Sequence, residues 1–288
     1  MTRISLSWAA TGSTSLFVLL WSSGAIVSRW GLDHGSPFAL LTLRFALALL
    51  ALLAWTRLRG GRLLPERGTR ATVMLTGATL IGGYSICYLL ALEGGMTPGV
   101  LATVLGAQPI LTLVLMERRP SLQRLAGLGL ALAGLSLVVF QSLSRAHYSV
   151  AGVAYALLAL VCVTAGAILQ KRTRQSPQAV LPLQYAASLA LCAAFLPVQP
   201  LHAEWSPGFI GPLLWLALVI SVGAQLLLYR LIQAGNLVNV TSLFYLVPVV
   251  TALMDYALLG NALSALGGAG MAAVLGGLAL ALRRAPGS

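Results

Sequence analysis

Long apolar runs separated by short polar stretches occur ten times along this chain. Because an α-helix rises 1.5 Å per residue, about 20 apolar residues cross roughly 30 Å of hydrocarbon. The pattern therefore predicts an all-α integral membrane protein with ten transmembrane helices and no separate soluble domain. We number the predicted helices as spans 1 to 10, and they lie at 13–30, 37–56, 72–92, 98–116, 123–141, 150–170, 179–198, 209–232, 237–258 and 263–282.

The second half of the sequence repeats the first. The tripeptide Gly24-Ala25-Ile26 returns as Gly166-Ala167-Ile168, and LTLRFA at 41–46 returns as LPLQYA at 181–186, so that the copies are separated by 140–142 residues. Each copy holds five spans, and this odd number makes the second copy enter the membrane from the opposite side. The sequence thus predicts two inverted five-helix repeats, 1–145 and 146–288, that together form one transport domain.

The repeat aligns polar residues of span 3 with those of span 8. Tyr84 and Tyr88 correspond to Gln225 and Tyr229, and residues four apart share one face of a helix. Inverted-repeat transporters bind their substrates between the two halves near the bilayer midplane. We therefore expect these four side chains to converge on a central cavity, although a helix–helix hydrogen bond is the alternative for any one of them. Further candidates for the lining are Ser22, Gln108, Thr164, Ser242 and Tyr245.

Pro109 and Pro248 lie within spans 4 and 9 at equivalent positions of the repeat. Proline removes an amide donor and clashes with the carbonyl four residues earlier, so both helices should kink. We interpret the pair as hinges that bend when the cavity changes sides. A kink that only shapes the packing is the alternative.

The formal net charge of +12 would indicate nucleic acid as a partner of a soluble protein, but this chain is 58% hydrophobic and only 8% charged. Its basic residues fall mainly in the short loops on one side of the predicted membrane. The positive-inside rule then predicts cytoplasmic N- and C-termini, with a lipid bilayer and no nucleic acid as the surroundings. Arg44 and Asp255 are charged residues within spans, close to the outer ends. We expect them to snorkel or to pair with each other, while attraction of a carboxylate by Arg44 is the alternative.

The residues that enzyme chemistry requires are missing from the predicted membrane interior. No phosphate-binding G-x-x-x-x-G-K-[ST] motif occurs, and the three histidines lie in predicted loops. We therefore expect no catalytic residue, no metal and no cofactor. Spans 5 and 10 consist largely of glycine, alanine and leucine, which allow close helix contact. We interpret them as outer supports that could also form a dimer interface, so that both a monomer and a homodimer stay open.

The start Trp21-Ser22-Ser23-Gly24, the pair Arg44-Phe45 and Pro109 followed by Glu117-Arg118 resemble the EamA-type ten-helix exporters of the drug/metabolite transporter (DMT) superfamily. Within this superfamily the chain is most similar to the YddG-type amino-acid exporters. The resemblance implies export across the bacterial inner membrane by alternating access, through a cavity between spans 1, 3, 4, 6, 8 and 9. Gln184-Tyr185 and Gly260-Asn261 depart from the family pattern in the second half.

Aromatic, hydroxyl and amide groups suit a small substrate that carries both charges and an apolar side chain. The leading hypothesis is thus a secondary exporter of amino acids and related metabolites. A multidrug exporter of lipophilic cations is an alternative, but it would require a carboxylate at mid-depth, where the sequence predicts none. A passive facilitator of neutral metabolites would require a continuous polar pore.

Overall fold

The computed structural model describes residues 8–96, 98–118, 120–140, 149–199, 201–259 and 264–282, without the side chains of 8–11, 25, 29, 98, 252 and 255–259. The described part is all-helical, apart from an isolated antiparallel bridge between Gly35 and Ala203. The helices of the first half are α1 (Trp8–Leu32), α2 (Pro37–Leu58), α3 (Arg70–Gly77), η1 (Ala78–Gly83), α4 (Tyr84–Glu93), α5 (Pro98–Leu105), α6 (Gln108–Met116) and α7 (Leu122–Val138). Those of the second half are α9 (Val150–Arg172), α10 (Pro177–Ala193), α11 (Pro207–Leu214), η2 (Trp215–Ala224), α12 (Gln225–Ala234), α13 (Leu237–Ser242), η3 (Leu243–Tyr245), α14 (Leu246–Leu259) and α15 (Ala265–Leu282).

These helices correspond to the ten predicted spans. In the described part of the chain, seven helical stretches are long and apolar enough to cross a membrane, and Leu122–Val138 and Leu237–Thr251 are shorter apolar helices. The remaining span is α10. Four spans consist of several shorter elements: span 3 is α3, η1 and α4, span 4 is α5 and α6, span 8 is α11, η2 and α12, and span 9 is α13, η3 and α14. The prediction of an all-α integral membrane fold is confirmed.

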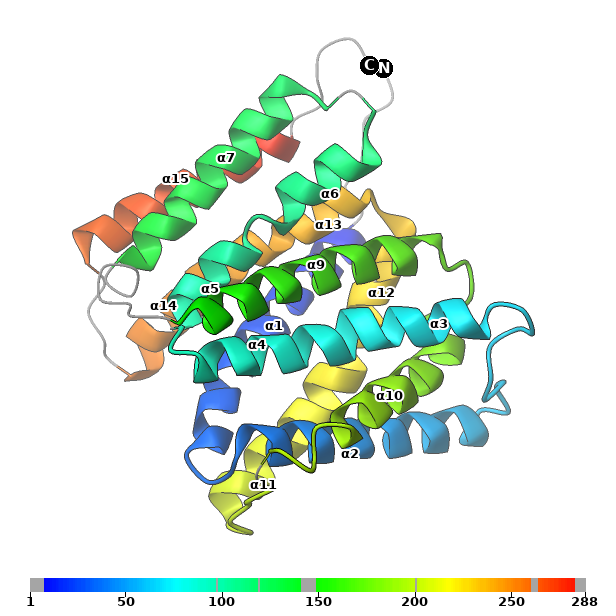
Figure 1. Ribbon diagram of the computed structural model, residues 1–288. Helices are drawn as coiled ribbons and strands as arrows, with labels where there is room; N and C mark the ends of the chain where they lie inside the picture. The colour runs from blue at the N-terminus through cyan, green and yellow to red at the C-terminus, as the bar shows by residue number, and fades with distance from the viewer. Residues whose placement is uncertain are drawn as a thin grey trace.

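Contacts between the two halves follow a two-fold pattern (Figure 1). The segment η1 packs on α9, and the equivalent pair, η2 and α1, also packs. Two further contacts join a helix to its own repeat counterpart: α2 with α10, and α7 with α15. An exchange of the halves therefore preserves the packing, as an inverted repeat requires.

Small residues allow the closest of these contacts. Gly127 and Gly134 of α7 lie against the backbone of α15, and Gly270 and Gly277 of α15 lie against that of α7. A side chain at any of these glycines would meet main-chain atoms of the other helix. The glycine faces are therefore used within the chain, and the oligomeric state stays a prediction that this packing does not test.

Spans 3 and 8 share a second feature, a π-helical segment at equivalent positions. The segment η1 ends just before Tyr84, and η2 ends just before Gln225. A π-helical turn accommodates an additional residue, so it rotates the side chains that follow it relative to a regular α-helix. In both repeats the first side chain after the π-helical segment is one of the predicted cavity residues.

The two proline-containing spans are interrupted, as their sequences predict. Span 4 breaks at Gly106 and Ala107, so that Pro109 occupies the first turn of the new helix α6. Proline is well accommodated there because the amides of a first turn have no intrahelical partner. Span 9 passes through the 3₁₀ turn η3 and resumes as α14 just before Pro248. The α-helix is therefore interrupted at equivalent places in the two halves.

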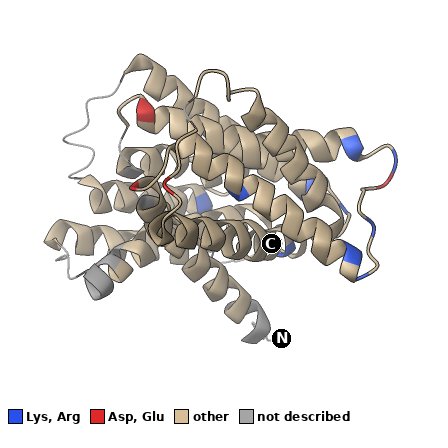
Figure 2. Cartoon of the chain, turned by 90° about the horizontal axis from the view of Figure 1, so that it is seen from below, with Lys and Arg blue, Asp and Glu red and all other residues tan. Residues whose placement is uncertain are grey.

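The two ends of the bundle differ in charge. We call one the basic end, because the loop between α2 and α3 there carries Arg59, Arg62 and Arg67 (Figure 2). At this end the Lys171 ammonium donates to the Gly235 carbonyl at 2.6 Å and so caps α12. We call the opposite end the His34 end. There the His34 carbonyl accepts from the Glu204 amide at 2.8 Å, which ties the loop after α1 to the loop before α11.

Candidate functional site

A cavity of about 850 Å³ lies between the two repeats. The first repeat contributes α1, α4, α5 and α6 to its wall, and the second contributes α9, η2, α12, α13 and α14. These elements belong to spans 1, 3, 4, 6, 8 and 9, the set that the family resemblance implies. The short segments η1 and η3 and parts of α2, α7 and α10 also contribute to the lining.

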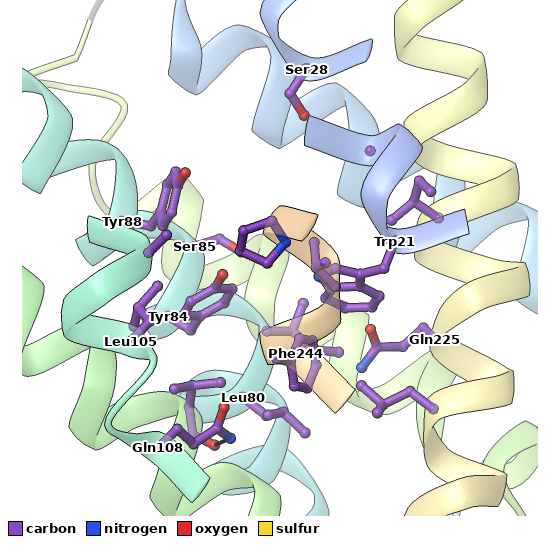
Figure 3. Close-up of a pocket in the computed structure, with 18 of the residues that line it drawn as sticks. Trp21, Ser28, Leu80, Tyr84, Ser85, Tyr88, Leu105, Gln108, Gln225 and Phe244 are labelled. Atoms are coloured by element: carbon purple, nitrogen blue, oxygen red, sulfur yellow. Dashed lines mark hydrogen bonds between the residues drawn. The ribbon is translucent and has the colours of Figure 1, made fainter. Parts of the chain in front are cut away.

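Aromatic rings form much of the cavity wall (Figure 3). Tyr84 and Tyr88 project from α4 with ring centroids 6.0 Å apart. Across the cavity, Trp21 of α1 lies against Phe244 of η3 in an edge-on contact at 5.4 Å. Such rings offer apolar faces and, at the tyrosines, hydroxyl groups as polar handles. The cavity is thus suited to a molecule with an apolar part.

Three further predicted residues line the cavity. Gln225 lies at the wall opposite the tyrosines in Figure 3. Gln108 begins α6, and its amide donates to the Val163 carbonyl across the repeat interface at 3.5 Å. The Tyr245 hydroxyl donates to the Gly106 carbonyl at 2.5 Å and so satisfies a carbonyl at the break of span 4. Tyr84, Tyr88, Gln225, Gln108 and Tyr245 therefore line one cavity, and their role in binding a substrate stays a prediction.

Three other candidates do not reach the lining. The Ser22 and Ser242 hydroxyls donate to carbonyls one turn earlier in their own helices, Val18 at 2.7 Å and Val238 at 2.6 Å. Such bonds within the helix are the usual alternative for a serine in a membrane helix. Thr164 is 3% exposed and is packed in the α9 interface, where its hydroxyl has no hydrogen-bond partner among the described residues. Their expected role in lining the cavity is not supported by these positions.

Tyr229 also lies outside the lining, because it takes part in a buried hydrogen-bond chain. Its hydroxyl donates to Gln184 Oε1 at 2.7 Å, and Gln184 Nε2 donates to Gln170 Oε1 at 2.9 Å. All three side chains are completely buried. They join α9, α10 and α12 one turn closer to the basic end than Gln225, and we call these three residues the basic-end seal.

The cavity opens toward the His34 end. Its lining residues there are partly exposed, and they include Leu32, Pro37, Leu92, Gly99 and Val139 at the ends of their helices. Toward the basic end the lining residues are buried, and they are Ala167, Leu228, Ile232 and Val240. The structure therefore represents a conformation that is open at one end of the bundle and closed at the other.

Pro109 and Pro248 both line this cavity, next to the helix breaks described above. Interrupted membrane helices are tolerated where they line a cavity within the protein, which is the position of both prolines. The role of the two prolines as hinges stays a prediction.

Of the two charged residues expected near the outer ends of spans, Arg44 lines the cavity. Its Nε donates to the Ser221 hydroxyl at 2.6 Å, so its partner is a neutral side chain from η2. The side chain of Asp255 lies outside the described residues, and the expected pairing is therefore not tested.

Sequence reasoning missed several lining residues, including Trp21, Ser28 and Phe244. Trp21 and Phe244 have no aromatic counterparts at the repeat offset, so the comparison of halves gave no signal for them. Ser28 is the repeat counterpart of Gln170, and that alignment could have identified it.

Comparisons with known proteins agree with this architecture. A family model described as the EamA-like transporter family matches residues 9–140 and again residues 150–283. A curated protein of Salmonella typhimurium (strain LT2), named "Probable amino-acid metabolite efflux pump", is 27% identical to this chain, and the alignment covers 91% of each protein. A crystal structure that is 22% identical superposes with a TM-score of 0.80 over 95% of this chain and 96% of its own, which shows that the fold is shared.

Proposed function

The chain belongs to the EamA-like transporter family, and we propose that it exports amino acids and related small metabolites across the bacterial inner membrane by alternating access. The family membership makes it a multi-pass membrane protein of a transporter family, as its sequence predicts. The name of the Salmonella relative, an amino-acid metabolite efflux pump, supports the proposed class of substrate.

One observation carries the mechanistic part of the proposal. The repeat counterparts of the sealed Gln170, Gln184 and Tyr229 are Ser28, Arg44 and Tyr88, at offsets of 140 to 142 residues. The three residues of the basic-end seal are completely buried. Their three counterparts line the cavity that is open toward the His34 end. Equivalent positions thus adopt the closed arrangement in one repeat and the open arrangement in the other. A second state with the roles exchanged gives access from the opposite side, as in other inverted-repeat transporters.

The lining of the cavity supports a zwitterionic substrate with an apolar side chain. Tyr84, Tyr88, Trp21 and Phe244 provide ring faces for the apolar part. Hydroxyl and amide groups, including Gln225 and Gln108, can bond to an ammonium or a carboxylate.

The alternatives are less well supported. An exporter of lipophilic cations requires an anionic partner at depth, and among the described side chains no Asp or Glu lines the cavity. A passive facilitator requires a pathway that is continuous from end to end, whereas this cavity is closed by buried residues at the basic end.

Counterflow in proteoliposomes tests the function directly. Proteoliposomes that contain the purified protein and are preloaded with one unlabelled amino acid should accumulate labelled L-phenylalanine, L-leucine or L-methionine from the outside. These three are expected because their apolar side chains match the ring faces. If correctly folded protein shows no counterflow with any amino acid of a full panel, the proposal is contradicted.

We expect Gln225→Ala and Tyr88→Ala each to weaken substrate binding by about 1–3 kcal/mol, the usual effect of removing one partner from a buried polar contact. The apparent affinity for L-phenylalanine in the counterflow assay gives the measurement. Gln123→Ala is the matched control, since the Gln123 amide donates to the Leu280 carbonyl between α7 and α15, away from the lining. Unchanged affinity in both cavity variants would place the substrate on other helix faces.

We also propose that the basic end faces the cytoplasm, as the positive-inside rule predicts for the loop that carries Arg62. In a variant without the native cysteines, Arg62→Cys should resist a membrane-impermeant thiol reagent in intact cells. His202→Cys, an exposed position at the His34 end, should be labelled readily. The reverse pattern would invert the orientation.

A further inference from the structure

Arg44 is a cation in a cavity wall that supplies no described counter-ion. It lies in the second turn of α2, within a helix that crosses the membrane. Of the described side chains that line the cavity, Arg44 alone carries a full charge at neutral pH. A charge at this depth is costly to insert, and such residues are retained where they face an aqueous cavity and contact a partner or a substrate.

The surroundings of Arg44 fix one side of its guanidinium group. Nε donates to the Ser221 hydroxyl at 2.6 Å, and the Ser221 carbonyl accepts from the Tyr185 hydroxyl at 2.6 Å. The guanidinium carbon also lies 6.0 Å from the centre of the Phe45 ring. Tyr185 and Ser221 are both 1% exposed, so this support is buried.

The remaining donors of Arg44 are on its two terminal nitrogens. A guanidinium has five N–H donors in a planar fork, and the Ser221 contact uses one of them. In the described part of the chain, the terminal nitrogens have no hydrogen-bond partner. The fork matches a carboxylate, which accepts two parallel bonds from it.

In the second repeat, the residue equivalent to Arg44 has hydrogen-bond partners on both polar atoms of its side chain. Gln184, the counterpart of Arg44, bonds to both Gln170 and Tyr229 and is completely buried. The counterparts of those two partners, Ser28 and Tyr88, line the cavity and are not bonded to Arg44. The first repeat therefore has a positive charge with free donors at a position where the second repeat has a neutral, saturated amide.

We propose that Arg44 binds the carboxylate of the transported molecule, so that the cavity accepts apolar monocarboxylates, amino acids among them, and rejects amines that lack a carboxylate. This inference rests on the proposed transport function and names the group through which the substrate is selected. The ammonium of an amino acid is then left to the ring faces and hydroxyls of Tyr84 and Tyr88.

Two small probes separate the charges. Hydrocinnamate has the phenyl ring and the carboxylate of phenylalanine without its ammonium, and phenethylamine has the ring and the ammonium without the carboxylate. In thermal-shift titrations of the purified full chain, hydrocinnamate should stabilise the wild type and phenethylamine should not. Arg44→Gln should weaken hydrocinnamate binding by about tenfold to a hundredfold, the usual range for a hydrogen-bonded charge pair.

Glutamine is the appropriate replacement because the second repeat already has it at this position. Arg44→Lys keeps the charge without the fork and should retain part of the affinity. Ser221→Ala removes the group that orients Nε, and it should lower hydrocinnamate affinity severalfold even if Arg44→Gln fails to fold. Gln123→Ala, at the contact of α7 with α15 and outside the lining, should leave the affinity unchanged. Equal hydrocinnamate affinity in wild type and Arg44→Gln, no hydrocinnamate binding by the wild type, or equal binding of phenethylamine would overturn the inference.

Counterflow of L-phenylalanine distinguishes the two proposals. If wild type and Arg44→Gln exchange L-phenylalanine with the same apparent affinity, amino-acid transport stands and the role of Arg44 is wrong. If neither exchanges any amino acid while hydrocinnamate still binds through Arg44, the carboxylate site stands and the proposed amino-acid transport is wrong.

Discussion

Replacing Gly166 by alanine should prevent normal assembly of the helices, whereas the same change at the equivalent Gly24 should be tolerated. A Cβ atom at Gly166 would lie 2.6 Å from Leu80 Cβ and 2.7 Å from the Leu80 backbone nitrogen, closer than real Cβ contacts. Because the obstacle includes main-chain atoms of η1, a rotamer change cannot relieve it. A Cβ atom at Gly24 would lie 3.5 Å from the end of the Ile220 side chain, which is ordinary van der Waals contact.

The two variants make the same chemical change at matched positions of the repeat, so helix propensity cancels between them. We expect Gly166→Ala to lower the free energy of unfolding by about 1–3 kcal/mol or more, because this is the typical effect of overpacking a tight core. Melting temperature in detergent and yield of monodisperse protein measure the difference. Equal stability of the two variants would show that α9 and η1 are less tightly packed than their contact indicates.

The ten helices could be predicted because each needs only length and hydrophobicity. Their ends were less accurate where a local signal decided them. Span 7 was predicted to start at 179, but α10 begins at Pro177, since Ser176 takes an extended conformation and proline fits the first helical position. The π-helical segments could not be predicted, because one additional residue per turn leaves no pattern of polar positions.

The candidate site shows a different limit. The repeat identified Tyr84 and Gln225 because this pair of equivalent positions lines the cavity in both halves. It could not show that Tyr229 is sealed while Tyr88 is open, since the sequence repeat is nearly symmetric and a single conformation is not. It also gave no signal for Trp21 and Phe244, whose contact joins segments that are far apart in sequence.

We expect Gln184→Leu to open the basic end of the transporter. The side chain of Gln184 accepts from Tyr229 and donates to Gln170, and both partners are completely buried. Leucine has a similar volume but leaves the Tyr229 hydroxyl and the Gln170 carbonyl oxygen without their partners, at about 1–3 kcal/mol for each stranded group. Opening of the seal would let water reach them, so the substitution selectively penalises the closed state.

A penalty of about 2 kcal/mol corresponds to a roughly 30-fold shift in the ratio of the two conformations. Leu228 provides the reporter, because it lines the cavity near the seal and is 4% exposed. In a background without native cysteines, Leu228→Cys should be labelled slowly from the basic end by an impermeant maleimide, and Gln184→Leu should accelerate that labelling. Gln123→Leu, which removes a glutamine outside the seal, should not. If labelling is unchanged while the melting temperature falls, the hydrogen-bond chain stabilises the fold in both conformations and does not set which end of the cavity is closed.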